Sequence, residues 1–329
     1  MKCTNKKRWI RCVCALTAAA LTLSGCGKLE YDIPYVVDAN VSTYNVVSKQ
    51  DNKTAVPFAS RLCVVSGNVP GASQEHLGDV NAAVLFDLKE NAVLYAQAAH
   101  DRVSPASLTK VMTALVALKY GNVNQTLTAT NAVTISEKGA QLCGLKPGDV
   151  MTLDQALRIL LLYSANDVAM LIADSVAGSV DRFVEMMNEE AKMLGATNTN
   201  FVNPHGLTDP NHYTTAYDLY LIFNEAIKYE TFNEIIQMTS YQTTYYDKDG
   251  KEKKFDKNTT NLFMRGDYSA PDNVTVIGGK TGTTSAAGHC LILLSRDVSG
   301  SPYISVICGA PSTDELYQGM TDLLEEIHK

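Results

Sequence analysis

Three short groups of residues, which occur in a fixed order along the chain, contain the residue types that nucleophilic catalysis requires. They are Ser107-x-x-Lys110, Ser164-Ala165-Asn166 and Lys280-Thr281-Gly282. Each group alone is a weak signal, because patterns this short arise by chance, although Lys-Thr-Gly is the rarer one. The ordered set is much more specific than any member. The chemistry it indicates is attack by a serine hydroxyl whose proton is taken by a lysine.

The first group stands at the start of an apolar stretch without glycine, residues 107–119, which predicts a helix. Residues three apart share a helix face, so Lys110 can point at the Ser107 hydroxyl. The free amides and the positive dipole end of the first turn favour an anionic intermediate beside Ser107. Burial would lower the pKa of Lys110 and make its amine a base.

The second group lies where one apolar helix, predicted at 153–163, gives way to another at 167–177. Such a junction can aim the Ser164 hydroxyl and the Asn166 amide into a cleft. Asp167 is expected to cap the second helix.

The third group ends a strand predicted at 274–283, with the character of a sheet edge. Glycines in that strand would let the backbone of a ligand lie close to it. Lys280 and Thr281 are then expected to face a carboxylate, with Gly282 and Thr283 beside them.

The elements that must position these groups predict an α/β fold of the α+β kind. An antiparallel sheet flanked by helices would carry an inserted, mostly helical subdomain at about 122–265. Strands are expected at 82–86, 93–96, 274–283, 290–295 and 303–308. Helices are expected at 107–119, 153–163, 167–177 and 181–194, and a closing helix begins with a capping box at Ser312–Glu315.

The N-terminus predicts export. Residues 1–25 hold five basic and no acidic residues, and their apolar stretch 13–23 would span only about half of a ~30 Å hydrocarbon core. Leu23-Ser24-Gly25-Cys26 resembles the bacterial lipobox, in which the cysteine is acylated and becomes the first mature residue. The alternative is an ordinary signal peptide. We therefore expect a lipoprotein signal peptide at 1–25 and an anchor at Cys26 that holds the protein on the outer face of the cytoplasmic membrane.

Residues 26–75 are expected to form a tether or linker, and the catalytic domain is expected at 76–329. Within the tether, the more apolar stretch 60–69 is expected to join the domain edge as a strand.

Composition excludes several function classes. The chain has 329 residues, 46% hydrophobic and 19% charged, which is unlike a disordered protein. Its net charge is −7, and without residues 1–25 the balance is 23 basic against 35 acidic residues, or −12. A surface this acidic would repel the phosphate backbone of a nucleic acid. No nucleic-acid partner is therefore expected.

The cysteines and histidines indicate neither a metal nor a cofactor. The sequence contains no C-x-x-C and no H-E-x-x-H motif. His205 and His212 lie in a Pro/Gly-rich loop, where we expect structural roles for them. Cys290 and Cys308 are equidistant from residue 299 of a predicted hairpin. Cross-strand spacing exceeds the usual disulfide spacing, so we expect buried free thiols.

The three groups in order resemble those of the D-alanyl-D-alanine carboxypeptidases, the low-molecular-mass penicillin-binding proteins. The resemblance covers about 81–329 and includes the stretches 160–167, 201–207 and 214–218. It implies a β-lactamase/transpeptidase-like fold and removal of the terminal D-Ala from peptidoglycan stem pentapeptides through a Ser107 acyl-enzyme. It also implies that β-lactam antibiotics act as covalent inhibitors.

The resemblance assigns roles to individual residues. It makes Lys110 the base and implies proton relay by Ser164 with Lys280. The resemblance also implies substrate contacts by Asn166, Lys280, Thr281, Gly282 and Thr283. The oxyanion hole would consist of the backbone N–H groups of Ser107 and Thr283.

The chain departs from the family in two places. Some relatives place an arginine after the last strand, where this chain reads Gly309-Ala310-Pro311-Ser312. Many carry a further β-rich domain and a C-terminal amphipathic anchor, which the N-terminal lipid is expected to replace here.

Three alternatives remain. A class A β-lactamase shares the three groups but needs a carboxylate base, and residues 198–207 contain no Glu-x-x-Leu-Asn. A catalytically silent penicillin sensor is the second. The third, a substrate-binding lipoprotein of a transporter, would show two lobes of alternating strands and helices, which the pattern lacks.

Overall fold

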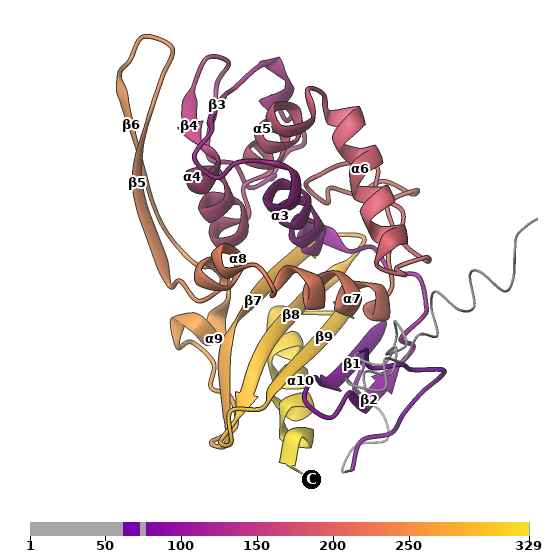
Figure 1. The fold of residues 1–329 in the computed structure, drawn as a ribbon. Helices are drawn as coiled ribbons and strands as arrows, with labels where there is room; N and C mark the ends of the chain where they lie inside the picture. The colour runs from indigo at the N-terminus through magenta and orange to yellow at the C-terminus, as the bar shows by residue number, and fades with distance from the viewer. Residues whose placement is uncertain (1–61, 73–76, 329) are drawn as a thin grey trace, which may run out of the picture. The chain divides into compact units, whose positions relative to one another are not determined.

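A five-stranded antiparallel sheet forms the centre of the domain in the computed structural model, which describes residues 62–72 and 77–328 (Figure 1). Its strand order is β2-β1-β9-β8-β7, so the strand that carries the Lys-Thr-Gly group lies at an edge. The strands are β1 (Ala82–Asp87), β2 (Ala92–Gln97), β7 (Val274–Thr284), β8 (Gly288–Asp297) and β9 (Pro302–Ala310). The predicted first hairpin and the predicted C-terminal strands are confirmed.

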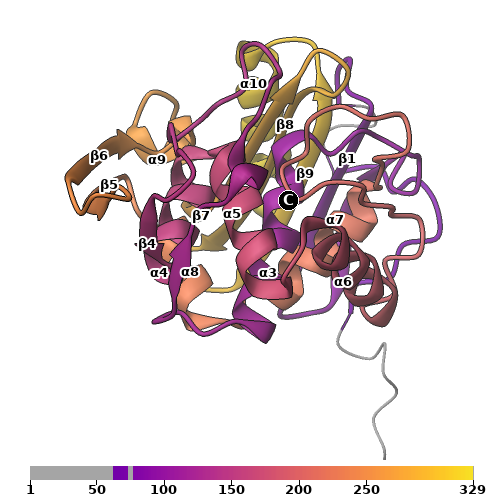
Figure 2. The ribbon, with the colours of Figure 1, turned by 90° about the horizontal axis from the view of Figure 1, so that it is seen from above.

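Helices cover both faces of this sheet. On one face α10 (Thr313–Glu325) buries the stripe Leu316, Met320, Leu323 and Leu324 against the strands. On the other face α7 (Ala216–Ala226) packs on β1 and β9, and α8 (Glu230–Ile236) packs on β7. Figure 2 shows β8 and β9 between α10 and α7. The α+β class expected from the sequence is confirmed.

The helix that follows the nucleophile candidate is buried almost all round. In α3 (Thr109–Tyr120) every residue from Thr109 to Ala117 is buried, as expected for a helix whose sequence is apolar on all faces. The other helices include α4 (Leu153–Arg158), α5 (Asn166–Ala177), α6 (Val180–Met193) and α9 (Leu262–Arg265). None of the helices within the described residues is long and apolar enough to span a bilayer.

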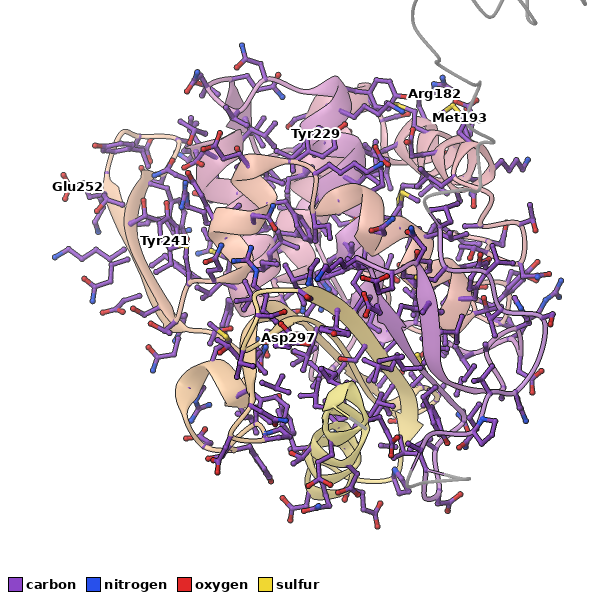
Figure 3. All side chains as sticks on the ribbon, turned by 60° about the horizontal axis from the view of Figure 1, so that its bottom comes forward. Arg182, Met193, Tyr229, Tyr241, Glu252 and Asp297 are labelled. Carbon is purple, nitrogen blue, oxygen red and sulfur yellow. The ribbon has the colours of Figure 1, made fainter. Side chains whose placement is uncertain are left out.

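A second sheet, which the sequence analysis did not predict, lies within the helical subdomain. Its order is β3-β4-β5-β6, and its strands are β3 (Thr126–Thr128), β4 (Val150–Thr152), β5 (Ser240–Tyr246) and β6 (Glu252–Asn258). The β5–β6 hairpin extends away from the main sheet (Figure 1). Figure 3 shows Tyr241 on the side of the hairpin toward the helices and Glu252 on its outer side, in keeping with their half-buried and exposed states.

The predicted boundary between tether and domain at residue 75 needs correction. Residues 62–72 pack on the domain: Cys63 is fully buried, its N–H donates to the Tyr220 hydroxyl at 2.9 Å, and its carbonyl accepts from the Tyr217 hydroxyl at 3.0 Å. The strand expected at 60–69 is reduced to one bridge, between Val69 and Ala96 of β2. Tyrosine hydroxyls from α7, rather than a ladder of strand hydrogen bonds, hold this segment. The predicted signal peptide, Cys26 and the tether up to residue 61 lie outside the described residues.

The cysteines on β8 and β9 agree with the sequence analysis. Cys290 and Cys308 are both free and fully buried on the face of the sheet that α7 and α8 cover. They fill space as small apolar side chains.

Candidate active site

Ser107 lies in a strained turn rather than in the first turn of an α-helix. It is the middle residue of a 3₁₀ turn, η2 (Ala106–Leu108), and α3 follows directly. The preceding Ala106 has φ +46°, a left-handed conformation that L-residues with a side chain rarely adopt. Strand β7 comes very close to this turn, because a Cβ atom on Gly282 would lie 2.9 Å from Ser107 N. Glycine is therefore required at 282 for β7 to lie against the nucleophile candidate.

Lys110 is fully buried, and its three contacts suit a neutral amine. Its Nζ lies 2.8 Å from Ser107 Oγ, 2.8 Å from Asn166 Oδ1 and 2.6 Å from the His205 carbonyl oxygen. The amide and carbonyl oxygens can only accept, which uses two N–H donors and leaves a lone pair toward the hydroxyl. Burial holds the pKa of Lys110 well below its usual value, the charge of Lys280 lowers it further, and Asp167 opposes the shift.

Ser164 stands at a break between helices that aims its hydroxyl at a second buried lysine. A π-helical turn, η4 (Ile159–Tyr163), ends at Ser164, whose φ is +69°. Such π turns and left-handed residues concentrate at functional sites. Lys280 Nζ donates to Ser164 Oγ at 3.0 Å and to the Thr281 carbonyl at 2.7 Å. Burial lowers the pKa of Lys280 to about 7.

Asp167 lies inside α5 rather than at its cap, because the helix begins at Asn166 with Ala165 as the N-cap, so the capping role expected of Asp167 is wrong. Its buried carboxylate accepts the backbone N–H groups of Cys143, Gly144 and Leu145 at 2.8–2.9 Å, besides that of Val168 at 3.0 Å. The same loop binds α5 a second time, because Asn166 N donates to the Gln141 carbonyl at 2.8 Å. These bonds hold the segment 139–145 as one wall of the site.

The predicted site residues surround one cleft of about 350 Å³. Ser107, Ser164, Asn166 and residues 281–283 line it, whereas Lys110 and Lys280 are buried beside these lining residues. Of the residues that the structure describes, those lining the cleft include no Asp or Glu. Among residues 62–72 and 77–328, no three His, Cys, Asp or Glu side chains form a group that could hold a metal ion.

The loop 203–212 takes part in the site, although only structural roles were expected for its two histidines, His205 and His212. His205 supplies the carbonyl that binds Lys110, and its ring Nδ1 accepts the N–H of Leu207 at 3.1 Å. His212 Nε2 lies 2.8 Å from the hydroxyl of Thr109, next to the nucleophile turn. Burial lowers the pKa of His205 to about 3 and that of His212 to about 4. No sequence signal reveals a carbonyl as a ligand, because every residue has one.

His289 is the other site residue that the sequence analysis missed. It pairs with Thr283 across β7 and β8, lines the cleft, and its Nδ1 lies 3.4 Å from Thr283 Oγ1 and 3.3 Å from Thr313 Oγ1. Thr281 Oγ1 contacts Thr260 Oγ1 at 2.6 Å. The available sequence signal was the position of His289 five residues after Thr284, where a hairpin can place it opposite Thr283.

Comparisons with known proteins found a matching family model and several relatives. The model of the family described as D-alanyl-D-alanine carboxypeptidase, peptidase S11, matches residues 71–312. The chain is 34% identical over 256 residues to D-alanyl-D-alanine carboxypeptidase DacF of Bacillus subtilis, covering 75% of this chain and 61% of that relative. It is 33% identical over 251 residues to DacC of Escherichia coli, covering 72% and 58%. The chain thus spans about three fifths of the length of these curated relatives.

The fold also resembles solved structures. The crystal structure of the Streptomyces K15 DD-transpeptidase superposes with a TM-score of 0.69 at 26% identity, over 80% of this chain and 98% of that one. With the family model matching most of the domain, and with relatives above 30% identity, the chain belongs to the peptidase S11 family of D-alanyl-D-alanine carboxypeptidases.

Proposed function

We propose that this protein is a serine D-alanyl-D-alanine carboxypeptidase that removes the terminal D-Ala from peptidoglycan stem pentapeptides. The observation that carries the proposal is the fully buried Lys110 amine, 2.8 Å from the Ser107 hydroxyl at the edge of a cleft. The names of the relatives support the substrate class. The same arrangement would make β-lactam antibiotics covalent inhibitors, because they acylate the nucleophile.

In the proposed reaction the Ser107 hydroxyl gives its proton to neutral Lys110 as Oγ attacks the carbonyl carbon of the penultimate D-Ala. The resulting oxyanion is stabilised by backbone N–H groups, for which Ser107 and Thr283 are the candidates. The C–N bond then breaks, and the leaving amine takes a proton by way of Lys110 or the Ser164–Lys280 pair. A water molecule attacks the Ser107 ester, loses its proton to the same groups and releases the shortened peptide.

Two observations bear on the alternatives. The described residues that line the cleft supply no carboxylate to hydrolyse a penicilloyl ester, which favours a peptidase over a class A β-lactamase. The likeness to a DD-transpeptidase supports a second candidate, transfer of the acyl group to an amine of another peptide. The yields of hydrolysed and transferred product, measured with a synthetic pentapeptide and an added amine acceptor, distinguish the two.

Ser107→Ala tests the nucleophile. We expect it to abolish D-Ala release and covalent labelling by penicillin, because no other hydroxyl lies in hydrogen-bond contact with Lys110 among the residues described. Lys110→Ala should be nearly as damaging, since groups that act as a unit fail together. Intact-mass spectrometry after incubation with penicillin is the measurement. A stable adduct on the Ser107→Ala protein would exclude the assignment.

The substrate carboxylate needs compensating charge in so acidic a protein, and the arginine that some relatives use is missing. We propose that Thr281, Thr283 and His289 hold it, with Lys280 behind them. Loss of a hydroxyl that binds a carboxylate costs about ten- to a hundredfold in affinity. Thr281→Val should therefore lower kcat/KM by about that factor on a free-acid peptide and far less on its C-terminal amide.

His289→Gln is tested in the same assay, because a ring N–H of His289 can donate a hydrogen bond to a carboxylate in the cleft. It should also penalise the free acid more than the amide. Equal losses on both substrates for both variants would show that these side chains only support the strand.

Burial of Lys280 makes stability depend on pH in a defined direction. Its pKa is lowered from about 10.5 to about 7, so between these pH values the unfolded chain binds a proton that the folded chain does not. Wild-type stability should therefore rise as pH increases from about 7 to 10, by at most about 1.4 kcal/mol per pH unit for this group. Lys280→Met removes this titration. The variant should be more stable than the wild type at pH 7, because it buries no ionisable amine, and this difference in stability should shrink as pH rises.

Urea unfolding of both proteins across this pH range measures the difference. The substitution also removes the effect of the Lys280 charge on the pKa of Lys110, so the difference reports Lys280 together with its coupling to Lys110. A difference that stays constant with pH would mean that Lys280 keeps an ordinary pKa in the folded state.

We also propose that Cys26 carries the lipid that anchors the protein to the outer face of the cytoplasmic membrane. The lipobox-like Leu23-Ser24-Gly25-Cys26 after a basic and apolar leader supports it. Cys26→Ser should leave an unprocessed or soluble form, read out by detergent phase partitioning and N-terminal mass. A Cys26→Ser protein that is still processed and still partitions into detergent would contradict the anchor.

A further inference from the structure

The peptide bond that joins Ala106 to Ser107 lies at the centre of the nucleophile turn. A trans peptide is planar, so its carbonyl oxygen and its N–H point in opposite directions. Whatever fixes the Ala106 carbonyl therefore also fixes the direction of the Ser107 N–H. That N–H is one of the two donors that the proposed function needs for the oxyanion. The left-handed φ of +46° at Ala106 shows that this orientation must be held by surrounding contacts.

Two buried side chains hold that carbonyl. Thr109 Oγ1 donates to the Ala106 oxygen at 2.8 Å, in addition to the Thr109 backbone N–H, and Thr109 is fully buried. His212 Nε2 lies 2.8 Å from the same hydroxyl.

The hydrogen-bond directions in this chain follow from a backbone amide. The Val202 N–H donates to His212 Nδ1 at 3.1 Å, so Nδ1 must be unprotonated and Nε2 carries the hydrogen. His212 therefore donates to Thr109, which leaves the hydroxyl hydrogen free to point at the Ala106 carbonyl. The ring is only 2% exposed, and burial lowers its pKa to about 4, so it is neutral at physiological pH. The hydrogen bonds thus run in one direction, from the Val202 N–H to His212, from His212 to the Thr109 hydroxyl, and from that hydroxyl to the Ala106 carbonyl oxygen.

A glycine closes the space on the other side of the carbonyl. A Cβ atom at Gly206 would lie 1.9 Å from the Ala106 oxygen and 2.8 Å from Thr109 Oγ1. The loop that gives Lys110 its His205 carbonyl thus also packs on the Ala106 carbonyl. The base and the peptide of the nucleophile are held by the same loop.

We propose that Thr109 and His212 are positioning residues that lock the Ala106–Ser107 peptide so that the Ser107 N–H faces the cleft as an oxyanion donor. The inference rests on the proposed acyl-enzyme function and deepens it. Neither side chain lines the cleft. Their effect should appear in the rate of acylation rather than in ground-state binding, because the oxyanion develops only in the transition state.

The test compares Thr109→Val with Thr109→Ser in the full-length protein. Valine keeps the shape and loses the hydroxyl, whereas serine keeps the hydroxyl. Thr199→Val is the matched control, since the Thr199 hydroxyl also has two partners, Asp218 Oδ2 at 2.7 Å and Thr214 Oγ1 at 2.8 Å, outside the proposed machinery. The readouts are the acylation rate constant and the non-covalent dissociation constant for a fluorescent penicillin, and the melting temperature.

Removing one oxyanion donor typically costs about 10²–10³ in rate, and a misdirected donor should cost part of that. We expect Thr109→Val to acylate about 10- to 100-fold more slowly with a dissociation constant within about threefold of wild type. Thr109→Ser should recover most of the rate. Thr199→Val should lower the melting temperature without changing acylation. Affinity for a boronic acid that forms a tetrahedral adduct with Ser107 should fall in parallel with the rate.

A Thr109→Val protein that acylates at the wild-type rate, or that loses non-covalent affinity instead of rate, would overturn the inference. So would a rate loss that Thr109→Ser does not recover. If Thr109→Val does not fold, His212→Gln gives the same readout, because its amide can still accept from Val202 but places its donor differently. A wild-type protein that penicillin does not acylate would instead refute the proposed function itself.

Discussion

Burial of two lysine amines without a carboxylate partner is the constraint on which the site depends. Lys110 and Lys280 are each at most 1% exposed, and neither forms a salt bridge within the described residues. Removing an ammonium group from water is costly unless the group loses its proton, so both pKa values fall. A lysine that is neutral near physiological pH can take a proton from a serine. The same side chain in solvent would stay charged and could not.

The surrounding structure satisfies these amines with neutral acceptors only. Lys110 meets an amide oxygen of Asn166 and a carbonyl of the 203–212 loop, and Lys280 meets the Ser164 hydroxyl and its own neighbouring carbonyl. A carboxylate in any of these positions would raise the pKa of the lysine and keep it protonated, so that it could not accept the serine proton. Asp167, the buried carboxylate whose charge acts on Lys110, instead accepts hydrogen bonds from the amides of residues 143–145. Acid and base are thus kept apart by backbone hydrogen bonds.

The site also concentrates backbone strain. Ala106 and Ser164 are non-glycine residues with positive φ, and a π-helical turn precedes Ser164. Each non-glycine residue held at positive φ costs about 1–3 kcal/mol and persists only where the surrounding packing determines it. Here α3 and the main sheet provide that packing, because α3 is buried over most of its length and β7 lies against the nucleophile turn through Gly282. A rigid core therefore supports the conformations that direct the Ser107 and Ser164 hydroxyls.

The sequence alone indicated the candidate chemistry and predicted most of the elements. The order of the three motifs identified Ser107, Lys110, Ser164, Asn166 and Lys280, which the structure brings together at one cleft. Hydrophobic periodicity located α6 and α10, because each buries one regular face. Continuous apolar runs on either side of a turn located β8 and β9, which are buried on both faces. The β5–β6 hairpin was missed, although Thr243–Tyr246 before Asp249-Gly250 carries strand and turn signals.

Only the tertiary structure decided how the remaining groups take part. The His205 carbonyl, the chain from His212 through Thr109, and His289 beside Thr283 depend on contacts between residues up to 103 positions apart. The docking of 62–72 on α7 depends on tyrosine hydroxyls more than 150 residues away. Local patterns report which face of an element is buried, and they carry no information about which distant backbone group will meet a side chain. That choice is made when the helices and sheets pack, because only then does each buried donor find the acceptor it must satisfy.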